Sequence, residues 1–202
     1  DIVVGTPGRV IDLIRQGKVA VDGVVCRKPG ADVDGSTQKV ELLAEECPFV
    51  SRGGLKLAAA IEAFSLPVLG LRALDVGQST GGFTDCLLQL GAAEVVGVEV
   101  GHGQLAESLR ADPRVKCFEK QDIRKLRPMG DPFDICVVDV SFISLRLVVP
   151  ALTAFLAQEA WIVALVKPQF ELGPSDIGSG GIVRDPSLHA LATAKVEEVC
   201  QS

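Results

Sequence analysis

The chain has 202 residues, of which 48% are hydrophobic and only 4% aromatic, and its formal net charge is −6. This length and apolar content allow one well-packed core with a small accessory domain, and they exclude a disordered chain. No apolar run approaches the roughly 18 residues of a membrane-spanning helix, and the negative charge argues against a nonspecific nucleic-acid binder. We therefore expect a cytoplasmic protein that does not associate with membranes.

The first 47 residues have the pattern of a small α+β module. An apolar-periodic stretch at residues 10–14 predicts a helix that Gly17 ends. Two β-rich segments follow, at residues 18–25 and 38–43, and an Asp-Gly pair at 22–23 marks the turn of a hairpin. Basic and acidic residues balance over the N-terminal part, whereas the rest of the chain is acidic. We expect RNA phosphates to contact clustered basic residues there, namely Arg9, Arg15, Lys18, Arg27, Lys28 and Arg52.

Strands and helices alternate in the remainder of the chain. Residues 48–70 predict a linker followed by an alanine-rich helix at 55–64. Beyond them we expect strands at 71–77, 94–100, 114–120, 133–140 and 161–166, and helices at 82–90, 104–110 and 145–156. This order is typical of a Rossmann-like, doubly wound α/β domain with a mostly parallel sheet over residues 71–202. The last strand consists of six apolar residues, which predicts burial on both faces of the sheet.

A first glycine loop, residues 77–82, follows the first strand of this sheet. Its glycines let the backbone approach a ligand, and its hydroxyls can bond to one. Glu99 ends the next strand, where a carboxylate can accept both hydroxyls of a ribose, and Asp122 after the third strand could bond an adenine amino group. These features suggest an adenosine-containing cofactor bound by Asp75, Gly77, Ser79, Thr80, Gly81, Gly82, Glu99 and Asp122.

A second glycine loop, residues 101–106, competes for the nucleotide. Gly101, Gly103 and Ala106 match the dinucleotide fingerprint, with Glu119 as its later acid, and this favours an NAD-dependent oxidoreductase. We rank this loop second, because its use would leave the richer first loop without a role. The first loop has one glycine before its polar residues, which suits a ligand without a pyrophosphate, such as S-adenosylmethionine.

Lys167 directly follows the six apolar residues of the last predicted strand. A lysine there can extend its ammonium to water, or it can belong to an active site, because open α/β sheets bind ligands outside the carboxyl ends of their strands. The two histidines, His102 and His189, are far apart and the cysteines form no C-x-x-C pair, so we expect no metal site.

Six motifs between residues 50 and 186 together resemble the TlyA-type, or haemolysin A, branch of the FtsJ/RrmJ-like ribosomal RNA 2′-O-methyltransferases. They are VSRGGLKL, LDVGQSTGGFTD, ADPRV, VVDVSFISL, LVKPQFE and GGIVRDP. The segment before residue 47 is similar to the alpha-L RNA-binding module of ribosomal protein S-four, which precedes the catalytic domain in that branch. The resemblance implies a class I methyltransferase domain, S-adenosylmethionine as the cofactor, and ribosomal RNA or ribosomal subunits as the partner.

The resemblance also implies a Lys-Asp-Lys-Glu active site, three members of which fall on Lys56, Asp139 and Lys167. In such enzymes the second lysine helps to deprotonate the ribose 2′-hydroxyl, and the other two groups position it. The family's final glutamate belongs to a motif beyond GGIVRDP, so we expect that glutamate and the last strands of the sheet to be missing, and Glu171 is a poor substitute. A noncatalytic RNA-binding protein with a nucleoside-binding Rossmann domain therefore remains an alternative to an active enzyme.

Overall fold

The structure is a computed structural model that describes residues 11, 14–15, 17–43, 47–128, 130–173, 176–178 and 180–201. The chain forms two compact units, Asp1–Glu46 and Cys47–Ser202. No helix in the described ranges is both long and apolar enough to cross a membrane.

The first unit contains a three-stranded antiparallel sheet with the order β2-β1-β3, built from β1 (Val19–Val21), β2 (Val24–Cys26) and β3 (Val40–Leu42). Asp22 and Gly23 connect β1 to β2 with φ values of 50° and 79°, the left-handed pair of a tight hairpin turn. Gly17 has a φ of 70° and donates its N–H to the carbonyl of Ile14 at 2.9 Å, as expected of a glycine that ends a helix. The predicted hairpin is therefore confirmed.

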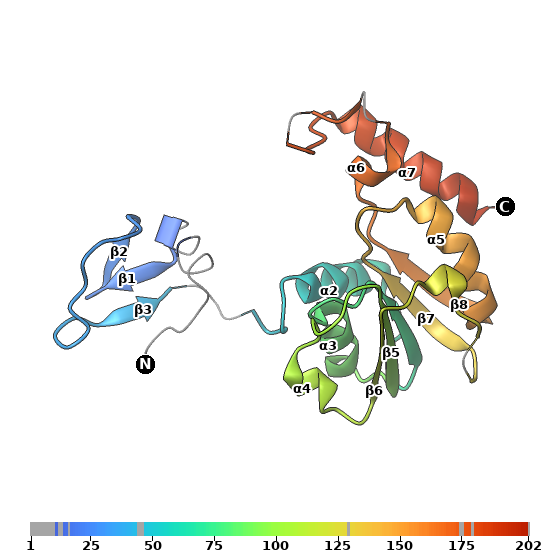
Figure 1. The fold of residues 1–202 in the computed structure, drawn as a ribbon, viewed down its shortest axis with the longest axis horizontal. Coiled ribbons are helices and arrows are strands. Elements are labelled where there is room, and N and C mark those ends of the chain that lie inside the picture. The colour runs from blue at the N-terminus through green and yellow to red at the C-terminus, as the bar shows by residue number, and fades with distance from the viewer. Residues whose placement is uncertain are drawn as a thin grey trace. The chain divides into compact units, whose positions relative to one another are not determined.

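The second unit is built on a five-stranded parallel sheet with the order β6-β5-β4-β7-β8 (Figure 1). Its strands are β4 (Arg72–Val76), β5 (Glu94–Glu99), β6 (Val115–Glu119), β7 (Phe133–Val138) and β8 (Leu156–Ala164). Its helices are α2 (Gly53–Phe64), α3 (Gly82–Gln89), α4 (Glu107–Arg110), α5 (Leu145–Leu152), α6 (Pro168–Glu171) and α7 (Pro186–Cys200), with short 3-10 turns η1 (Ile123–Lys125) and η2 (Thr153–Phe155). The strand order confirms the doubly wound fold, with β4 at its centre.

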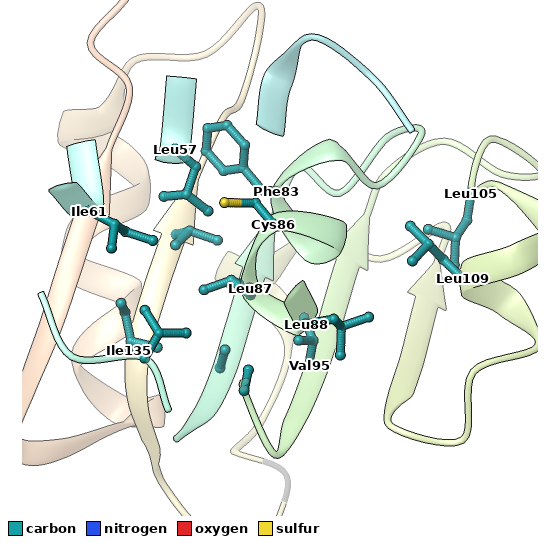
Figure 2. Close-up of a cluster of buried hydrophobic side chains, with 14 residues drawn as sticks. Leu57, Ile61, Phe83, Cys86, Leu87, Leu88, Val95, Leu105, Leu109 and Ile135 are labelled. Atoms are coloured by element: carbon teal, nitrogen blue, oxygen red, sulfur yellow. The ribbon is translucent and has the colours of Figure 1, made fainter. Parts of the chain in front are cut away.

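Two apolar clusters cover the two faces of this sheet, because successive strand residues point to opposite sides. On one face, Leu57 and Ile61 of α2 and Leu87 of α3 pack against Val95 and Ile135 of the strands (Figure 2). The other face packs against α5 and α7, through residues that include Leu74, Val98, Val138, Leu145, Leu152 and Val196. Helix α2, which we predicted over residues 55–64 after a linker, is thus part of the core of this unit.

The structure corrects two predictions at the last strand. Strand β8 begins at Leu156, five positions earlier than predicted, and α5 ends at Leu152. The apolar run is also not buried on both faces, since Trp161 and Ile162 are 49% and 37% exposed. Among the described strands, β8 pairs only with β7, so β8 lies at the edge of the sheet. Its apolar composition alone therefore predicted more burial than the structure shows.

Parallel strands bring their carboxyl ends to one edge of the sheet. The first glycine loop after β4, Glu99 at the end of β5, Asp139 after β7 and Lys167 after β8 therefore share this edge.

Candidate active site

Two adjoining cavities lie at this edge. The larger one, of about 650 Å³, is lined by residues that follow β4, β5, β6 and β7, and the smaller one, of about 240 Å³, lies toward α2 and β8. Gly77, Ser79, Asp139 and Ser141 line both of them. A group bound in the larger cavity therefore lies next to a group bound in the smaller one, and these four residues surround the junction.

Glu99 presents a preorganised carboxylate to the larger cavity. The backbone N–H of Ser79 donates to its Oε2 at 2.9 Å, and the N–H of Gly101 donates to its Oε1 at 2.8 Å. A carboxylate oxygen can accept more than one hydrogen bond, so both oxygens keep capacity for the hydroxyls of a ribose.

Asp122 and Arg124 form the polar rim of the same cavity. Nη2 of Arg124 lies 2.6 Å from Oδ2 of Asp122, and this hydrogen bond lowers the pKa of the Asp122 carboxyl below its usual value. Val98, Ile123 and Val148 provide apolar lining. The cavity thus combines one hydroxyl-binding carboxylate, an ionised acid at its rim and an apolar surface suited to a flat ring.

The two glycine loops do not form rival sites, because both contribute to the larger cavity. The hydroxyl of Ser79 donates to Oε1 of Gln104 at 3.2 Å, and Gly101 and Gln104 line the cavity together with Gly77. Glu119, the acid of the dinucleotide pattern, is instead paired with Arg110 and lies outside both cavities. The second loop therefore lacks the arrangement that a dinucleotide fingerprint requires.

The first glycine loop comes very close to the strand end of β7. Gly77 has a φ of 85°, and a Cβ there would lie 2.7 Å from the carbonyl oxygen of Asp139, so only glycine fits. Thr80 and Gly82 line the smaller cavity, whereas Gly81 lines neither.

Asp75 does not reach either cavity. Its side chain is completely buried beneath the loop, where the hydroxyl of Thr84 donates to its Oδ2 at 2.6 Å. Burial raises the pKa of Asp75 to about 7. Asp75, which we predicted to bind the cofactor, therefore supports the loop from beneath instead.

The smaller cavity brings together the three charged residues that the resemblance singled out. Lys56 comes from α2, Asp139 follows β7, and Lys167 is the residue before α6. Nζ of Lys167 lies 2.6 Å from Oδ1 of Asp139 and donates to the hydroxyl of Ser141 at 2.8 Å. Both members of the ion pair are only about one fifth exposed, so solvent screens their attraction less than that of a surface pair.

Glu171 has a different position. It is buried, and its carboxylate accepts from the hydroxyl of Ser144 at 2.6 Å and from the backbone N–H of Leu145 at 2.8 Å. Glu171 thus caps the first turn of α5 and holds the loop after β7, which agrees with its exclusion from the predicted catalytic group.

Sequence reasoning missed Ser141 and Phe142 in that loop. Ser141 lines both cavities, and Phe142 is 92% exposed at the larger one although its φ is 64°. A bulky side chain rarely adopts a positive φ. The ring of Phe142 lies 5.3 Å from that of Phe170 in α6. Ser141 and Phe142 closely follow the predicted Asp139 in the chain, and this position is the signal that could have identified them.

The expected RNA-binding residues lie in both units. Arg15, Lys18, Arg27 and Lys28 are exposed in the first unit, and Arg52 is exposed just before α2 in the second. Val19 pairs with Cys26, so Lys18 and Arg27 lie at the same end of the hairpin. Arg9 lies outside the described residues. Within the described part of the chain, no cluster of His, Cys, Asp or Glu is arranged to hold a metal ion.

Known proteins similar to this chain share both its fold and its motifs. The chain is 48% identical to the 16S/23S rRNA (cytidine-2′-O)-methyltransferase TlyA of Mycobacterium tuberculosis over 94% of its own length and 72% of the relative. It is 39% identical to hemolysin A of Brachyspira hyodysenteriae, over 88% of this chain and 74% of that one.

Among solved structures, a protein described as a hemolysin from Streptococcus thermophilus superposes with a TM-score of 0.79 at 40% identity, covering 97% of this chain and 72% of the other. Residues 49–202 match the family described as FtsJ-like methyltransferase, and this range includes both cavities and the Lys167–Asp139 pair. The chain therefore belongs to the FtsJ-like methyltransferase family.

Proposed function

We propose that this protein transfers a methyl group from S-adenosylmethionine to a ribose 2′-hydroxyl of ribosomal RNA. The observation that carries the proposal is the Lys167–Asp139 ion pair in a small cavity that adjoins a larger, nucleoside-sized one. The names of the TlyA relatives, which are rRNA (cytidine-2′-O)-methyltransferases, support this reaction.

The larger cavity fits S-adenosylmethionine. Its volume of about 650 Å³ lies within the usual range of small-molecule sites. Glu99 would accept hydrogen bonds from the ribose hydroxyls, and Asp122 would accept one from the adenine amino group. The adenine ring would contact the apolar side chains of Val98, Ile123 and Val148. The bound cofactor supplies an electrophilic methyl group on a sulfonium.

The smaller cavity would hold the acceptor ribose. Asp139 and Ser141 occupy two directions around the Lys167 ammonium, which has three donors, so one direction remains for the 2′-hydroxyl oxygen. The carboxylate of Asp139, held beside this ammonium, would accept the proton of the 2′-hydroxyl as its oxygen takes the methyl group, and the carbon–sulfur bond of the donor would break to leave a neutral thioether. Lys56, in the same cavity, would orient the hydroxyl and offset the developing negative charge.

Phe142 offers a platform for the base of the acceptor nucleotide. Its ring is almost fully exposed beside the cavities, and Phe170 packs against it. An enzyme that acts on a nucleotide of folded RNA must bring that nucleotide out of its stack, and an exposed aromatic ring can compensate for the lost stacking. The unfavourable backbone of Phe142 is consistent with a functional constraint.

The first unit would bind the RNA outside the active site. Its exposed basic residues include Lys18 and Arg27 at the same end of a small hairpin, where they can contact phosphates. We assign residues 1–47 to RNA binding and residues 71–202, with the preceding helix, to catalysis. An RNA substrate of this kind places the enzyme in the cytoplasm.

Incubation of the protein with ribosomal subunits and methyl-labelled S-adenosylmethionine tests the proposal. Nuclease digestion and mass spectrometry should find the label on a ribose 2′-oxygen. Label on a base would contradict the acceptor assignment. RNA binding without label transfer would favour the noncatalytic alternative, and binding of NADH in preference to S-adenosylmethionine would favour the oxidoreductase.

A further inference from the structure

Gln78 has an unusual position for a polar loop residue. It lies in the first glycine loop between Gly77 and Ser79, which line both cavities, and it lines the smaller cavity itself, yet only 3% of the residue is exposed. Burial of an amide is costly unless it forms hydrogen bonds. Its presence here therefore calls for a structural or functional reason.

The side chain of Gln78 occupies the space that a side chain at Gly97 would fill. A Cβ at Gly97 would overlap the amide group of Gln78. Gly97 lies in the middle of β5, beside Asp75 of β4, and its φ is not in the left-handed region. Its lack of a side chain therefore serves the close approach of Gln78 and not a special backbone conformation.

The amide is also bonded in a buried chain of polar groups. Nε2 of Gln78 donates to Oγ1 of Thr84 at 2.8 Å, and Oγ1 of Thr84 donates to Oδ2 of Asp75 at 2.6 Å. Thr84 belongs to the first turn of α3, and Asp75 belongs to β4. Gln78 thus ties the loop to both the helix and the strand that flank it.

This anchor lies next to a strained residue. Ser79 has a φ of 48°, a conformation that residues other than glycine adopt only where the surroundings impose it. In that conformation Ser79 donates its N–H to Glu99 and its hydroxyl to Gln104. The position of Ser79 therefore determines how Glu99 faces the larger cavity.

We propose that Gln78 is a positioning residue for binding of the methyl donor: its buried amide, seated over Gly97 and bonded to Thr84, holds Ser79 where it orients Glu99. The inference rests on the proposed function, because it takes S-adenosylmethionine as the ligand of the larger cavity. Gln78 itself need not touch the ligand.

Gln78→Met tests the amide, because methionine keeps a similar length over Gly97 and removes the hydrogen bond to Thr84. Calorimetric titration with S-adenosylmethionine should show a dissociation constant about tenfold higher than that of the wild type, while the thermal midpoint stays within a few degrees. A dissociation constant within twofold of the wild-type value would overturn the proposal and leave Gln78 as a filler of space.

Amide hydrogen exchange in the ligand-free protein gives a readout that does not depend on the donor. The Ser79 amide should exchange faster in Gln78→Met, and also in Gly97→Ala, whose added methyl group displaces the glutamine amide. Unchanged exchange in both variants would refute the anchor. A wild-type protein that fails to bind S-adenosylmethionine would refute the proposed function instead, while the exchange rates would still decide the role of Gln78.

Discussion

The Nζ atom of Lys167 lies 2.6 Å from Oδ1 of Asp139, and the two residues follow neighbouring parallel strands. Val138 pairs with Ala164 at the ends of these strands, so the register of β7 and β8 brings the two charges together. This relationship explains why a cation follows the apolar run of the last strand. Its partner is the acid that follows the strand beside it.

Replacement of Lys167 should abolish methyl transfer with little effect on the cofactor. We expect Lys167→Met to lower the transfer rate by about 100-fold or more, because it removes the ammonium that orients the 2′-hydroxyl and holds Asp139, the acceptor of the proton. Calorimetric binding of S-adenosylmethionine should stay near the wild-type value, since Lys167 does not line the larger cavity. Lys116→Met, at an exposed lysine paired with Glu94, is the matched control. Wild-type transfer by Lys167→Met would exclude it from catalysis.

Replacement of Glu99 should weaken cofactor binding. A hydrogen bond to a charged group contributes about 1.5–3 kcal/mol, so Glu99→Gln should raise the dissociation constant of S-adenosylmethionine roughly tenfold to 100-fold. Glu119→Gln is a close control, because Glu119 pairs with Glu99 in strand register but lies outside the cavity. Equal effects of the two substitutions would count against ribose binding by Glu99.

Asp75 should make the stability of the protein depend on pH. Burial raises its pKa from 3.8 to about 7, so between these pH values the folded state keeps a proton that the unfolded state has released. The free energy of unfolding should therefore fall as the pH rises through this window, by up to about 1.4 kcal/mol per pH unit, and level off above pH 7.

Urea unfolding of the wild type and of Asp75→Asn at pH 5 and pH 7.5 measures this contribution. The asparagine keeps an acceptor for Thr84 but does not titrate, so the variant should lack the decline. Contributions from other carboxyls cancel in the comparison. Parallel pH profiles for the two proteins would show that Asp75 is ionised throughout.

Phe142 should affect binding of the RNA substrate and not the overall fold. Stacking of a base on an aromatic ring contributes about 1–3 kcal/mol, so Phe142→Ala should raise the KM for the ribosomal substrate roughly tenfold. Phe64→Ala, which removes another exposed ring at the end of α2, should leave this KM unchanged. If both variants behave alike, the ring of Phe142 does not receive the base.

Glu171 should act through stability. Glu171→Ala leaves the N–H of Leu145 and the hydroxyl of Ser144 without their buried acceptor, at a cost of about 1–3 kcal/mol in the free energy of unfolding. Glu198→Ala, at an exposed position in α7, should change stability little. Denaturant titration compares them, and equal stability of the two variants would argue against the capping role.

The sequence by itself determined the α/β order and the hairpin of the first unit, which follow from apolar periodicity and the Asp22-Gly23 turn. It also predicted the residues of the candidate active site: Glu99 and Lys167 from their positions at strand ends, and Lys56 and Asp139 from the resemblance to a known family. Parallel topology then requires that Glu99, Asp139 and Lys167 share one edge of the sheet, whatever the packing.

Only the tertiary structure decided how the remaining groups are used. In the structure Asp75 is buried beneath the first glycine loop, and the two glycine loops that seemed to compete both line one cavity. Glu171 caps the first turn of α5. The structure also left β8 half exposed, because burial depends on what packs against a strand and not on its apolarity. Contacts such as Gln78 over Gly97 join side chains from different elements, and no local pattern in the sequence encodes such a fit.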